Sequence, residues 1–380
     1  LDVEKSTGIR LLRSVLWKNL DNMSGVGVAV RLGNLSSLAM ENCTVWEHPN
    51  SVTFRQGASL TVTNSVLSAN GTSGRIYQFD SFSGPASSFQ GDYNCYSRKN
   101  GALIADKPYL TGGNDLYNDL PTWGRASGSE QHSMTLEPGF HSEVNGDFHP
   151  RSTRGRFTLT GWANDSTNSP LIDAGHPARA ATNEPAPNGD LINIGAYGGT
   201  PEASMTQTNP PWLRVVSYNE SGETLSGNAL LYWLHGGMES NALVQLDYTT
   251  DQWTWHSIAS NLAAGSRQYE WNVSEMPLTV GLYWRVVLQS QTNIFDESDA
   301  AVAVKTTNYT YYINDDSTVG DVWCSGAGRD WDPWVTYGTN PAAPLKSLKV
   351  LLDHLPVGGG DKVYIDTGVY PVASSNAVVL

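Results

Sequence analysis

The chain has 380 residues, of which only 16% are charged, and it is rich in glycine (37) and proline (19). This composition favours many short strands and turns over long helices, which are built from Ala, Leu, Glu and Lys. The formal net charge of −14 argues against nucleic-acid binding, and against a long acidic polysaccharide as ligand unless a divalent cation bridges the two. We expect an all-β, globular protein of two or three domains.

The three cysteines, Cys43, Cys95 and Cys324, are far apart and form no CxxC pair, so neither a zinc ribbon nor a disulfide framework is expected. Two buried free thiols and a single Cys43–Cys95 bridge both remain open, and free thiols are favoured. No run of about 18 apolar residues predicts a membrane span. No signal peptide follows Leu1, and the chain stops on an apolar run, so we expect a segment of a larger protein.

A repeat occupies the start of the chain. The segments IRLLRSVL, LAMENCTV and LTVTNSVL begin at Ile9, Leu38 and Leu60, so successive units are 29 and 22 residues apart. Each unit alternates apolar and polar residues and turns at its fifth position. Such alternation, repeated at this interval, predicts a solenoid with one strand-turn-strand rung per unit.

The fifth position of the repeat holds Arg13, Asn42 and Asn64. Asparagine tolerates left-handed backbone, and stacked asparagines at a solenoid bend can hydrogen-bond along the stack. Asn42 also begins Asn-Cys-Thr, which leaves glycosylation as the alternative. The structural interpretation is favoured.

A series of motifs follows the repeat in a fixed order: D-x-N-x-Y, a Trp-containing excursion, E-x-H-S, P-x-F…GDFH, S-P-x-I-D-A-G and I-G-A-Y. The residues that carry them are Asp92, Asn94, Tyr96, Trp123, Glu130, His132, Ser133, Pro138, Phe140, Gly146, Asp147, Phe148, His149, Ser169, Pro170, Ile172, Asp173, Ala174, Gly175, Ile194, Gly195, Ala196 and Tyr197. In this order, residues 85–200 resemble the terminal region of bacterial right-handed parallel β-helix proteins of the pectate-lyase-like superfamily. The resemblance implies that residues 1–205 are the last rungs and terminal cap of such a helix.

The stretch Ser169–Ala178 is expected to seal the end of the solenoid. The last rung would otherwise expose unpaired strand edges and apolar core, and Pro170 and Pro177 cannot donate to a strand ladder. Asp173 is assigned to holding this seal. In the resemblance, His132 and His149 belong to the same ending motifs and have hydrogen-bonding roles.

A polar, proline-bearing linker at residues 206–211 precedes seven short apolar-alternating runs in residues 212–305. Seven such strands in about 95 residues are typical of an immunoglobulin-like or fibronectin type III sandwich. Its core would be packed by Trp233, Trp271 and Trp284. Trp253 and Trp255 could form a sugar-stacking face, although a core position for one and ordinary exposure for the other is favoured.

Residues 306–380 resemble the N-terminal entry of a right-handed β-helix: an Asp- and Gly-rich loop, a capping helix and a first strand in KVYIDTGVY. The helix is predicted from a single apolar stripe of Leu345, Leu348, Leu351, Leu352 and Leu355. Because the chain ends there, the second β-helix would be truncated.

The acidic loop of this segment is the best metal candidate. It supplies Asn314, Asp315, Asp316, Asp321, Asp330 and Asp332, and calcium prefers such oxygen ligands. The spacing does not match an EF-hand, so a solvated Asp- and Gly-rich turn is the favoured alternative. No other cofactor is predicted.

The repeat units carry neither the paired carboxylates nor the Gly-His-Gly of pectin-type hydrolases, and Asp80 near Arg75 is too little for a lyase site. We therefore expect a non-catalytic segment of a large secreted or cell-surface protein, continuous with further β-helix modules and involved in glycan contact, adhesion or scaffolding. The alternative is part of a polysaccharide lyase or glycoside hydrolase whose active groove lies outside this segment. Whether the protein is an enzyme stays open, because the fold hosts both classes.

Overall fold

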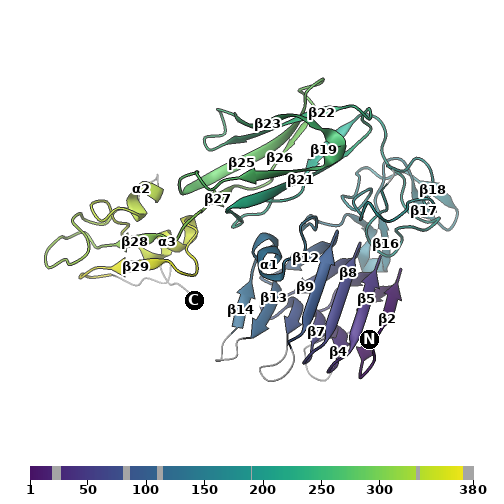
Figure 1. Cartoon of the computed structure of the whole chain (residues 1–380), viewed down its shortest axis with the longest axis horizontal. Helices are drawn as coiled ribbons and strands as arrows, with labels where there is room; N and C mark the ends of the chain where they lie inside the picture. The colour runs from purple at the N-terminus through teal and green to yellow at the C-terminus, as the bar shows by residue number, and fades with distance from the viewer. Residues whose placement is uncertain (19–26, 80–85, 109–113, 190, 331–333, 371–380) are drawn as a thin grey trace.

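The structure, a computed structural model, describes residues 1–18, 27–79, 86–108, 114–189, 191–330 and 334–370. The chain is all-β, as expected from composition, with only short helices among the described residues. Figure 1 shows a coiled region at the N-terminus, a two-sheet region packed over it, and a C-terminal segment that extends to one side.

The coiled region, residues 1–117, consists of three sheets that the chain visits in turn, and its strands pair in parallel except at the last one. Sheet A contains β1 (Asp2–Val3), β4 (Val28–Leu32), β7 (Asn50–Phe54), β10 (Arg75–Phe79) and β13 (Leu103–Pro108), with β14 (Asn114–Tyr117) antiparallel to β13. Sheet B contains β2 (Ile9–Leu12), β5 (Ser37–Glu41), β8 (Ser59–Thr63) and β11 (Ser88–Asp92). Sheet C contains β3 (Val15–Trp17), β6 (Thr44–Trp46), β9 (Val66–Asn70) and β12 (Cys95–Lys99).

The register of sheet B follows the sequence repeat. Ile9 pairs with Leu38, Leu38 with Leu60, and Leu60 with Phe89. Sheet A was not predicted, because the repeat units recognised in the sequence cover only strands of sheets B and C. Its strand β7 is buried throughout, including the polar Ser51 and Thr53. Each coil therefore has three strands and not the two predicted.

The bend between sheets B and C has left-handed backbone at each repeat, with φ of 46° at Arg13, 51° at Asn42, 51° at Asn64 and 56° at Tyr93. The Asn64 amide donates to Oδ1 of Asn42 at 3.4 Å, and both side chains are buried. The predicted asparagine stack is confirmed. A buried amide is also unreachable for glycosylation in the folded chain.

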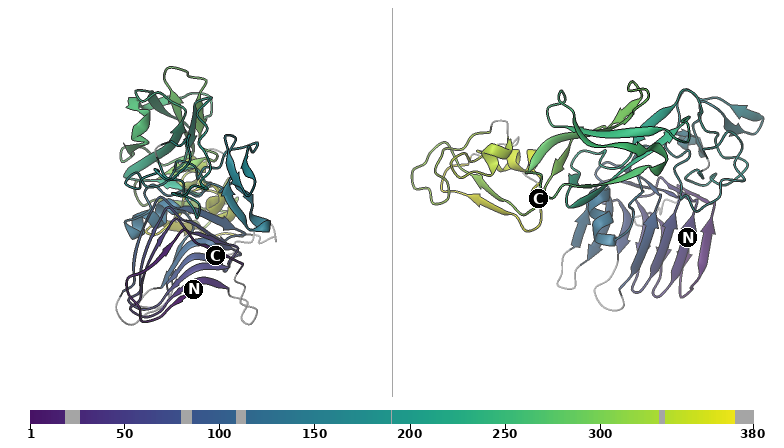
Figure 2. Two further views of the ribbon diagram at one scale, coloured as in Figure 1. Left: turned by 90° about the vertical axis from the view of Figure 1, so that its right-hand side faces the viewer. Right: turned by 45° about the horizontal axis from the view of Figure 1, so that its top comes forward.

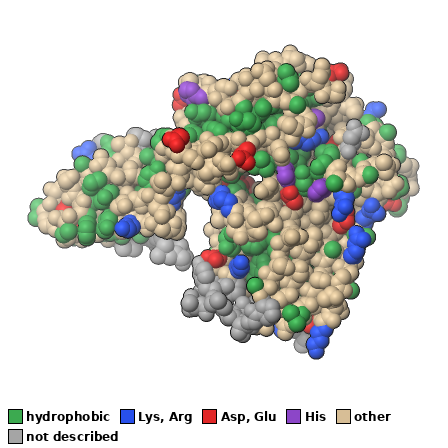
Figure 3. Space-filling model, in the orientation of Figure 1, with side chains coloured by type: hydrophobic (Ala, Val, Ile, Leu, Met, Phe, Trp, Pro, Cys, Tyr) green, Lys and Arg blue, Asp and Glu red, His purple; other side chains and the backbone are tan. Residues whose placement is uncertain are grey.

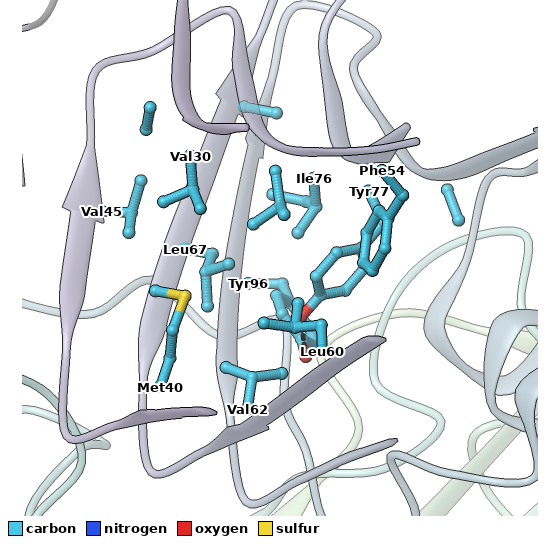
Figure 4. Packing of buried hydrophobic residues seen from close by; sticks show 14 of the residues in the cluster. Val30, Met40, Val45, Phe54, Leu60, Val62, Leu67, Ile76, Tyr77 and Tyr96 are labelled. Carbon is cyan, nitrogen blue, oxygen red and sulfur yellow. Dashed lines mark hydrogen bonds between the residues drawn. The ribbon is translucent and has the colours of Figure 1, made fainter. Parts of the chain in front are cut away.

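The interior of the coil is filled by inward-facing side chains from all three sheets (Figure 4). Phe54 stacks on Phe79 at 4.3 Å between ring centroids, and the hydroxyls of Tyr77 and Tyr96 lie 2.9 Å apart. Helix α1 (Leu120–Ser127) begins after its N-cap Asp119 and places Trp123 against the aromatic rings of the last coil. These ring neighbours of Trp123 are Tyr77, Phe79, Phe89 and Tyr117. Helix α1 therefore covers the end of the coil.

The docking segment, residues 134–206, runs along the outside of the coil and includes β15 (Phe140–Ser142), β16 (Asp147–Pro150), β17 (Arg156–Thr158) and β18 (Gly161–Ala163). The Asn42 amide donates to the carbonyls of Asn193 (2.8 Å) and Gly195 (3.1 Å). Oδ1 of Asn64 accepts from the His176 N–H at 2.8 Å. Ser169–Ala178 thus lies along the row of bend residues between sheets B and C. It does not seal the end of the coil as predicted. Bend asparagines that face a neighbouring backbone provide the hydrogen bonds which fix it there.

The docking segment is held together internally by Asp173. Its side chain accepts hydrogen bonds from the Gly189 N–H (2.9 Å) and the Thr206 hydroxyl (2.7 Å), and its own N–H donates to Asn193. Asp173 has the holding role that was predicted, but within a lateral segment.

The sandwich, residues 212–304, has a strand at each of the seven predicted runs and two additional short strands. Figure 2 shows this region in green beside the coiled region. Its strands are β19 (Trp212–Val215), β20 (Thr224–Leu225), β21 (Asn228–Gly236), β22 (Leu243–Thr249), β23 (His256–Ala263), β24 (Gln268–Asn272), β25 (Thr279–Leu288), β26 (Phe295–Glu297) and β27 (Val302–Val304). One sheet has the order β19-β21-β24 and the other β20-β27-β25-β22-β23, with β26 beside β25. Trp233 and Trp284 are fully buried between them, and Trp271 is partly buried.

The C-terminal segment, residues 306–370, pairs β28 (Thr310–Ile313) in parallel with β29 (Lys362–Ile365), beside α2 (Trp334–Gly338) and α3 (Leu348–His354). Ser347 caps α3 by accepting from the Val350 N–H. The predicted leucine stripe is only partly right. Leu351 and Leu355 are buried, but Leu345 precedes the helix and bridges to Ile313, and Leu352 is 36% exposed.

Cys43, Cys95 and Cys324 are free and buried. The Cys43–Cys95 bridge that the sequence left open is absent from the structure.

Candidate functional site

The sandwich packs on the coiled region through one continuous apolar core, which we call the shared core. Sheet C turns its outer face toward this core, and the docking segment packs there beside one end of the sandwich (Figure 1). The side chains in it include Trp46, Val66 and Cys95 from sheet C, Phe140, Phe148 and Leu171 from the docking segment, and Val216, Tyr232 and Leu234 from the sandwich. Burial of large aromatic and aliphatic side chains from three parts stabilises one relative orientation of those parts.

His132 joins the coil to the sandwich at the rim of the shared core. Its Nδ1 lies 2.8 Å from Oδ2 of Asp92, and its Nε2 lies 2.5 Å from Oε1 of Gln268 on β24. Its ring stacks on Tyr93 at 4.7 Å. Burial lowers the pKa of His132, but the hydrogen bonds to Asp92 and Gln268 and the charge of Asp92 outweigh burial, so the net shift is upward. The imidazolium form can donate to both oxygens at once.

Further polar contacts cross the same junction. Arg98 on β12 forms an ion pair with Glu220 at 2.6 Å. Arg267 donates to the Asp173 carbonyl at 3.4 Å. Histidine, acidic and basic side chains gather along the junction in Figure 3, so the apolar contact has a polar rim, as protein interfaces do.

A cleft of about 200 Å³ opens between α1 and the sandwich. Glu130, Glu223, Glu270 and Arg125 are among the side chains that line it. Buried carboxyl groups in a cleft are candidates for general acid or base chemistry, so their hydrogen bonds decide what this cleft can do.

Both oxygens of Glu130 are already occupied. Oε1 accepts from the Tyr96 hydroxyl at 2.5 Å, and Oε2 accepts from the Ser133 hydroxyl and from the Asn94 amide. Burial raises the pKa of Glu130 to about 7. A Cβ on Gly91 would come within 2.0 Å of Glu130, so the backbone also encloses this carboxyl group.

The other two acids also accept hydrogen bonds, but Glu223 is buried whereas Glu270 is exposed. Oε2 of Glu223 accepts from the Glu220 N–H at 3.1 Å, and burial raises the pKa of Glu223 to about 8. Glu270 accepts from the Asn228 amide at 2.6 Å. The acids of the cleft hydrogen-bond to loops and strand ends of the protein. The cleft therefore has the geometry of a domain interface.

The predicted calcium ligands are spread over several separate contacts. Asp315 accepts from the backbone N–H groups of Ser317 and Val369, and Asp316 forms an ion pair with Lys346 at 2.6 Å. Their oxygens thus face protein donors.

Two further acids of this loop accept hydrogen bonds. Oδ2 of Asp321 accepts from the Asn314 amide at 2.6 Å, while its buried Oδ1 has no hydrogen-bond partner among the described residues. Asp330 accepts from the backbone N–H groups of Lys346 and Ser347. Asp332 lies outside the described residues. Across the part of the chain that the structure describes, no three His, Cys, Asp or Glu side chains form a group that could hold a metal ion.

The two tryptophans of the predicted sugar-stacking face differ in accessibility. Trp253 is 89% exposed at the β22–β23 turn, whereas Trp255 is partly buried and its ring faces the Arg285 guanidinium at 4.0 Å. They do not present two open ring faces, although Trp253 alone remains accessible.

The residues that build the junction were not recognised from sequence. Gln268, Glu220, Tyr232 and Arg267 belong to no motif, and each lies on a strand or turn of an ordinary sandwich pattern. On the coil and docking-segment side the quoted motifs did contain junction residues, among them His132, Asp92 and Phe140.

None of the helices in the described ranges is long and apolar enough to cross a membrane. Comparison of the chain with protein-family models, with curated proteins and with solved structures gave no match. The function of this chain must therefore be argued from its geometry.

Proposed function

We propose that residues 1–205 are the last turns and terminal segment of a right-handed parallel β-helix, and that residues 306–380 begin a second one. Support for the first comes from three parallel sheets that the chain visits in turn, with sheet B in register at the intervals of the repeat. Support for the second comes from the parallel pair β28–β29 beside a capped helix.

Residues 212–305 are proposed to be an immunoglobulin-like or fibronectin type III module. Seven main strands divide between two sheets, and strands adjacent in sequence, such as β21 and β22, lie in different sheets. Such a division around a tryptophan-containing core is typical of these sandwiches.

The proposed function is that of a rigid, non-catalytic segment of a large secreted or cell-surface protein, which presents its sheet surfaces for glycan contact or adhesion. The observation that carries this proposal is the shared core, because it joins coil, docking segment and sandwich into one packed unit. A packed junction fixes the geometry of a long surface, whereas a flexible linker does not.

The outer face of sheet B is the surface that best suits a repeating polymer. Ser37, Ser59 and Ser88 align across β5, β8 and β11, and Ser88 donates to Ser59 at 2.9 Å. Thr61 is exposed at the centre of this face. Strands about 4.8 Å apart repeat such hydroxyl groups at regular intervals along the coil.

The free thiols are compatible with an oxidising environment. Burial raises the pKa of Cys43 and of Cys95, and a buried, protonated thiol is unreactive.

The test is to incubate the chain with pectin, alginate and neutral glucans, and to measure retention by affinity electrophoresis together with product release. We expect retention of at least one polymer without turnover. Thr61→Arg should abolish retention by blocking sheet B, and Ser260→Arg on the exposed strand β23 is the matched control. Turnover by the wild-type chain, or retention of none of the polymers, would contradict the proposal.

A further inference from the structure

A second cavity, of about 300 Å³, lies where the docking segment meets strand β19. The docking segment contributes Thr167, Asn168 and Ile172, and the sandwich contributes Trp212 and Arg214. The exposed lining is largely apolar. Its size is at the lower end for small-molecule sites, and an apolar wall with few polar groups is typical of them.

Trp212 forms a fixed wall of this cavity. Its indole lies against Gly236, where a Cβ would come within 2.5 Å of Nε1. Nε1 donates to the Gln207 carbonyl at 3.2 Å. The indole is thus held by glycine on the neighbouring strand and by a hydrogen bond at its edge, and such a preorganised ring costs little conformational entropy when a ligand binds.

Arg214 lies two residues further along β19 and faces the same way, with its guanidinium carbon 6.0 Å from the centre of the Trp212 ring. Among the described residues, its side chain has no hydrogen bond and no ion pair within 4.0 Å, and it interacts only at longer range with Asp296 and Asp299. Burial lowers its pKa. A half-buried guanidinium with unused donors is matched best by a carboxylate, which can accept two parallel N–H bonds.

The side-chain amides at the rim of this cavity are held in place by hydrogen bonds to other protein groups. The Asn168 amide donates to Oε1 of Gln207, and Oδ1 of Asn168 accepts from the Thr153 N–H at 2.8 Å. The rim is therefore a fixed polar edge, and Arg214 supplies the charge available to a ligand.

We infer that this cavity binds a single carboxylate-bearing sugar unit, such as a uronic acid at a glycan end, with its ring against Trp212 and its carboxylate on Arg214. A long polyanion would be repelled by the net charge of −14. One carboxylate in a local site feels mainly Arg214, because salt screens charges beyond about 8–10 Å. The inference deepens the proposed glycan contact and rests on it for the class of ligand.

The neighbourhood of Arg214 adds a dependence on pH. Asp296 accepts from the Val215 N–H at 2.7 Å, and burial raises the pKa of Asp296 to about 6, with Arg214 opposing the shift and Asp299 and Glu297 adding to it. Protonation of Asp296 between pH 7.5 and 5.5 removes a competitor for Arg214, while the sugar carboxylate stays ionised. Affinity should therefore rise as pH falls across this range.

The test is calorimetric titration of the full chain with galacturonic acid and with galactose, its neutral counterpart, at pH 7.5 and 5.5. We expect binding of galacturonic acid at least about tenfold tighter than of galactose, equivalent to one charge-assisted hydrogen bond. Arg214→Gln should remove that preference, Trp212→Phe should weaken binding of both sugars, and Asp296→Asn should remove the pH dependence. Arg55→Gln, at an exposed arginine of the coil, is the matched control and should bind as the wild type does.

The outcomes separate this inference from the proposed function. Equal binding of the two sugars, or galacturonic acid binding that Arg214→Gln leaves unchanged, would overturn the inference. Polymer retention that is sensitive to Thr61→Arg would still support the proposed function in that case. Loss of galacturonic acid binding in Arg214→Gln, with circular dichroism unchanged, would support the inference.

Discussion

The sandwich meets its two neighbours in different ways. Toward the coil it contributes Tyr232 and Leu234 to a core that also holds Trp46 and Phe140, and His132 and Arg98 form polar contacts at the rim. Toward the C-terminal segment, the apolar contact is made by Leu278 and Val280 against the cluster around Tyr311.

A buried ion pair adds to the second junction. Lys305, at the end of the sandwich, lies 2.5 Å from Asp361 and donates to the Pro356 carbonyl. Among the described residues, the sandwich is therefore joined to the coil by a shared core, and to the C-terminal segment by a small apolar contact and a charge pair. We therefore expect the coil and sandwich to unfold together, and the C-terminal segment to separate more easily.

The largest effect is expected from Trp46→Ala. Loss of a buried indole from the shared core should cost about 3–5 kcal/mol, and calorimetry should show the coil and the sandwich destabilised together. Trp253→Ala, at an exposed tryptophan, should change stability by less than about 0.5 kcal/mol. Two separate thermal transitions, of which only one shifts, would show that the coil and the sandwich do not unfold together.

Leu278→Ala should act at the other junction only. A buried leucine truncated to alanine costs about 2–3 kcal/mol, and here the loss should appear as faster proteolysis between sandwich and C-terminal segment, with the main thermal transition unchanged. Leu116→Ala, at an exposed leucine of β14, is the control. A fall in the temperature of the main thermal transition would show that the C-terminal segment also unfolds together with the sandwich.

The substitution Glu223→Gln tests how the raised pKa of this cleft residue makes stability depend on pH. The carboxyl group has a pKa of about 8 in the folded chain and about 4.5 when unfolded, so the folded state binds the extra proton between these values. Its contribution to stability is full below pH 4.5 and is lost as pH rises through 8. We expect the stability of the variant to change less between pH 5 and pH 9 than the stability of the wild type. If the stability of the variant and of the wild type changed with pH in parallel, the raised pKa of buried Glu223 would be contradicted.

The smallest effect is expected from His132→Gln. The folded pKa of His132 is raised, so its stabilisation is full below about pH 6.5 and is lost as pH rises through the folded pKa. The variant should lose about 1 kcal/mol at pH 5.5 and less at pH 8.5. His256→Gln, at an exposed histidine on β23, should show no such difference. An equal loss at both pH values would assign His132 a purely packing role.

The sequence predicted what local patterns encode. The 29- and 22-residue spacing gave the register of sheet B, and asparagine at the fifth position marked the left-handed bend. The sandwich runs alternate, so their strands were recognisable one by one. Asp173 was correctly assigned a structural role.

The rest depends on contacts between residues distant in sequence. Sheet A lies outside the repeat units, and β7 is buried on both faces although Ser51 to Phe54 alternate in polarity. Ser169–Ala178 docks laterally because Asn64, more than a hundred residues earlier, offers an acceptor there. Leu352 continues a helical spacing, but the described residues leave it 36% exposed on α3. The Trp212–Arg214 cavity needs two domains to form, and no single motif encodes it.

Native-state hydrogen exchange distinguishes a coil and sandwich that form one packed unit from two regions that unfold independently. The amides of β9 in the coil and of β21 in the sandwich should exchange with the same opening free energy, and Trp46→Ala should lower both equally, while β28 exchanges through a separate, easier opening. If β21 kept its full protection when β9 lost it, the two regions would be independent and the account of a rigid scaffold would be wrong.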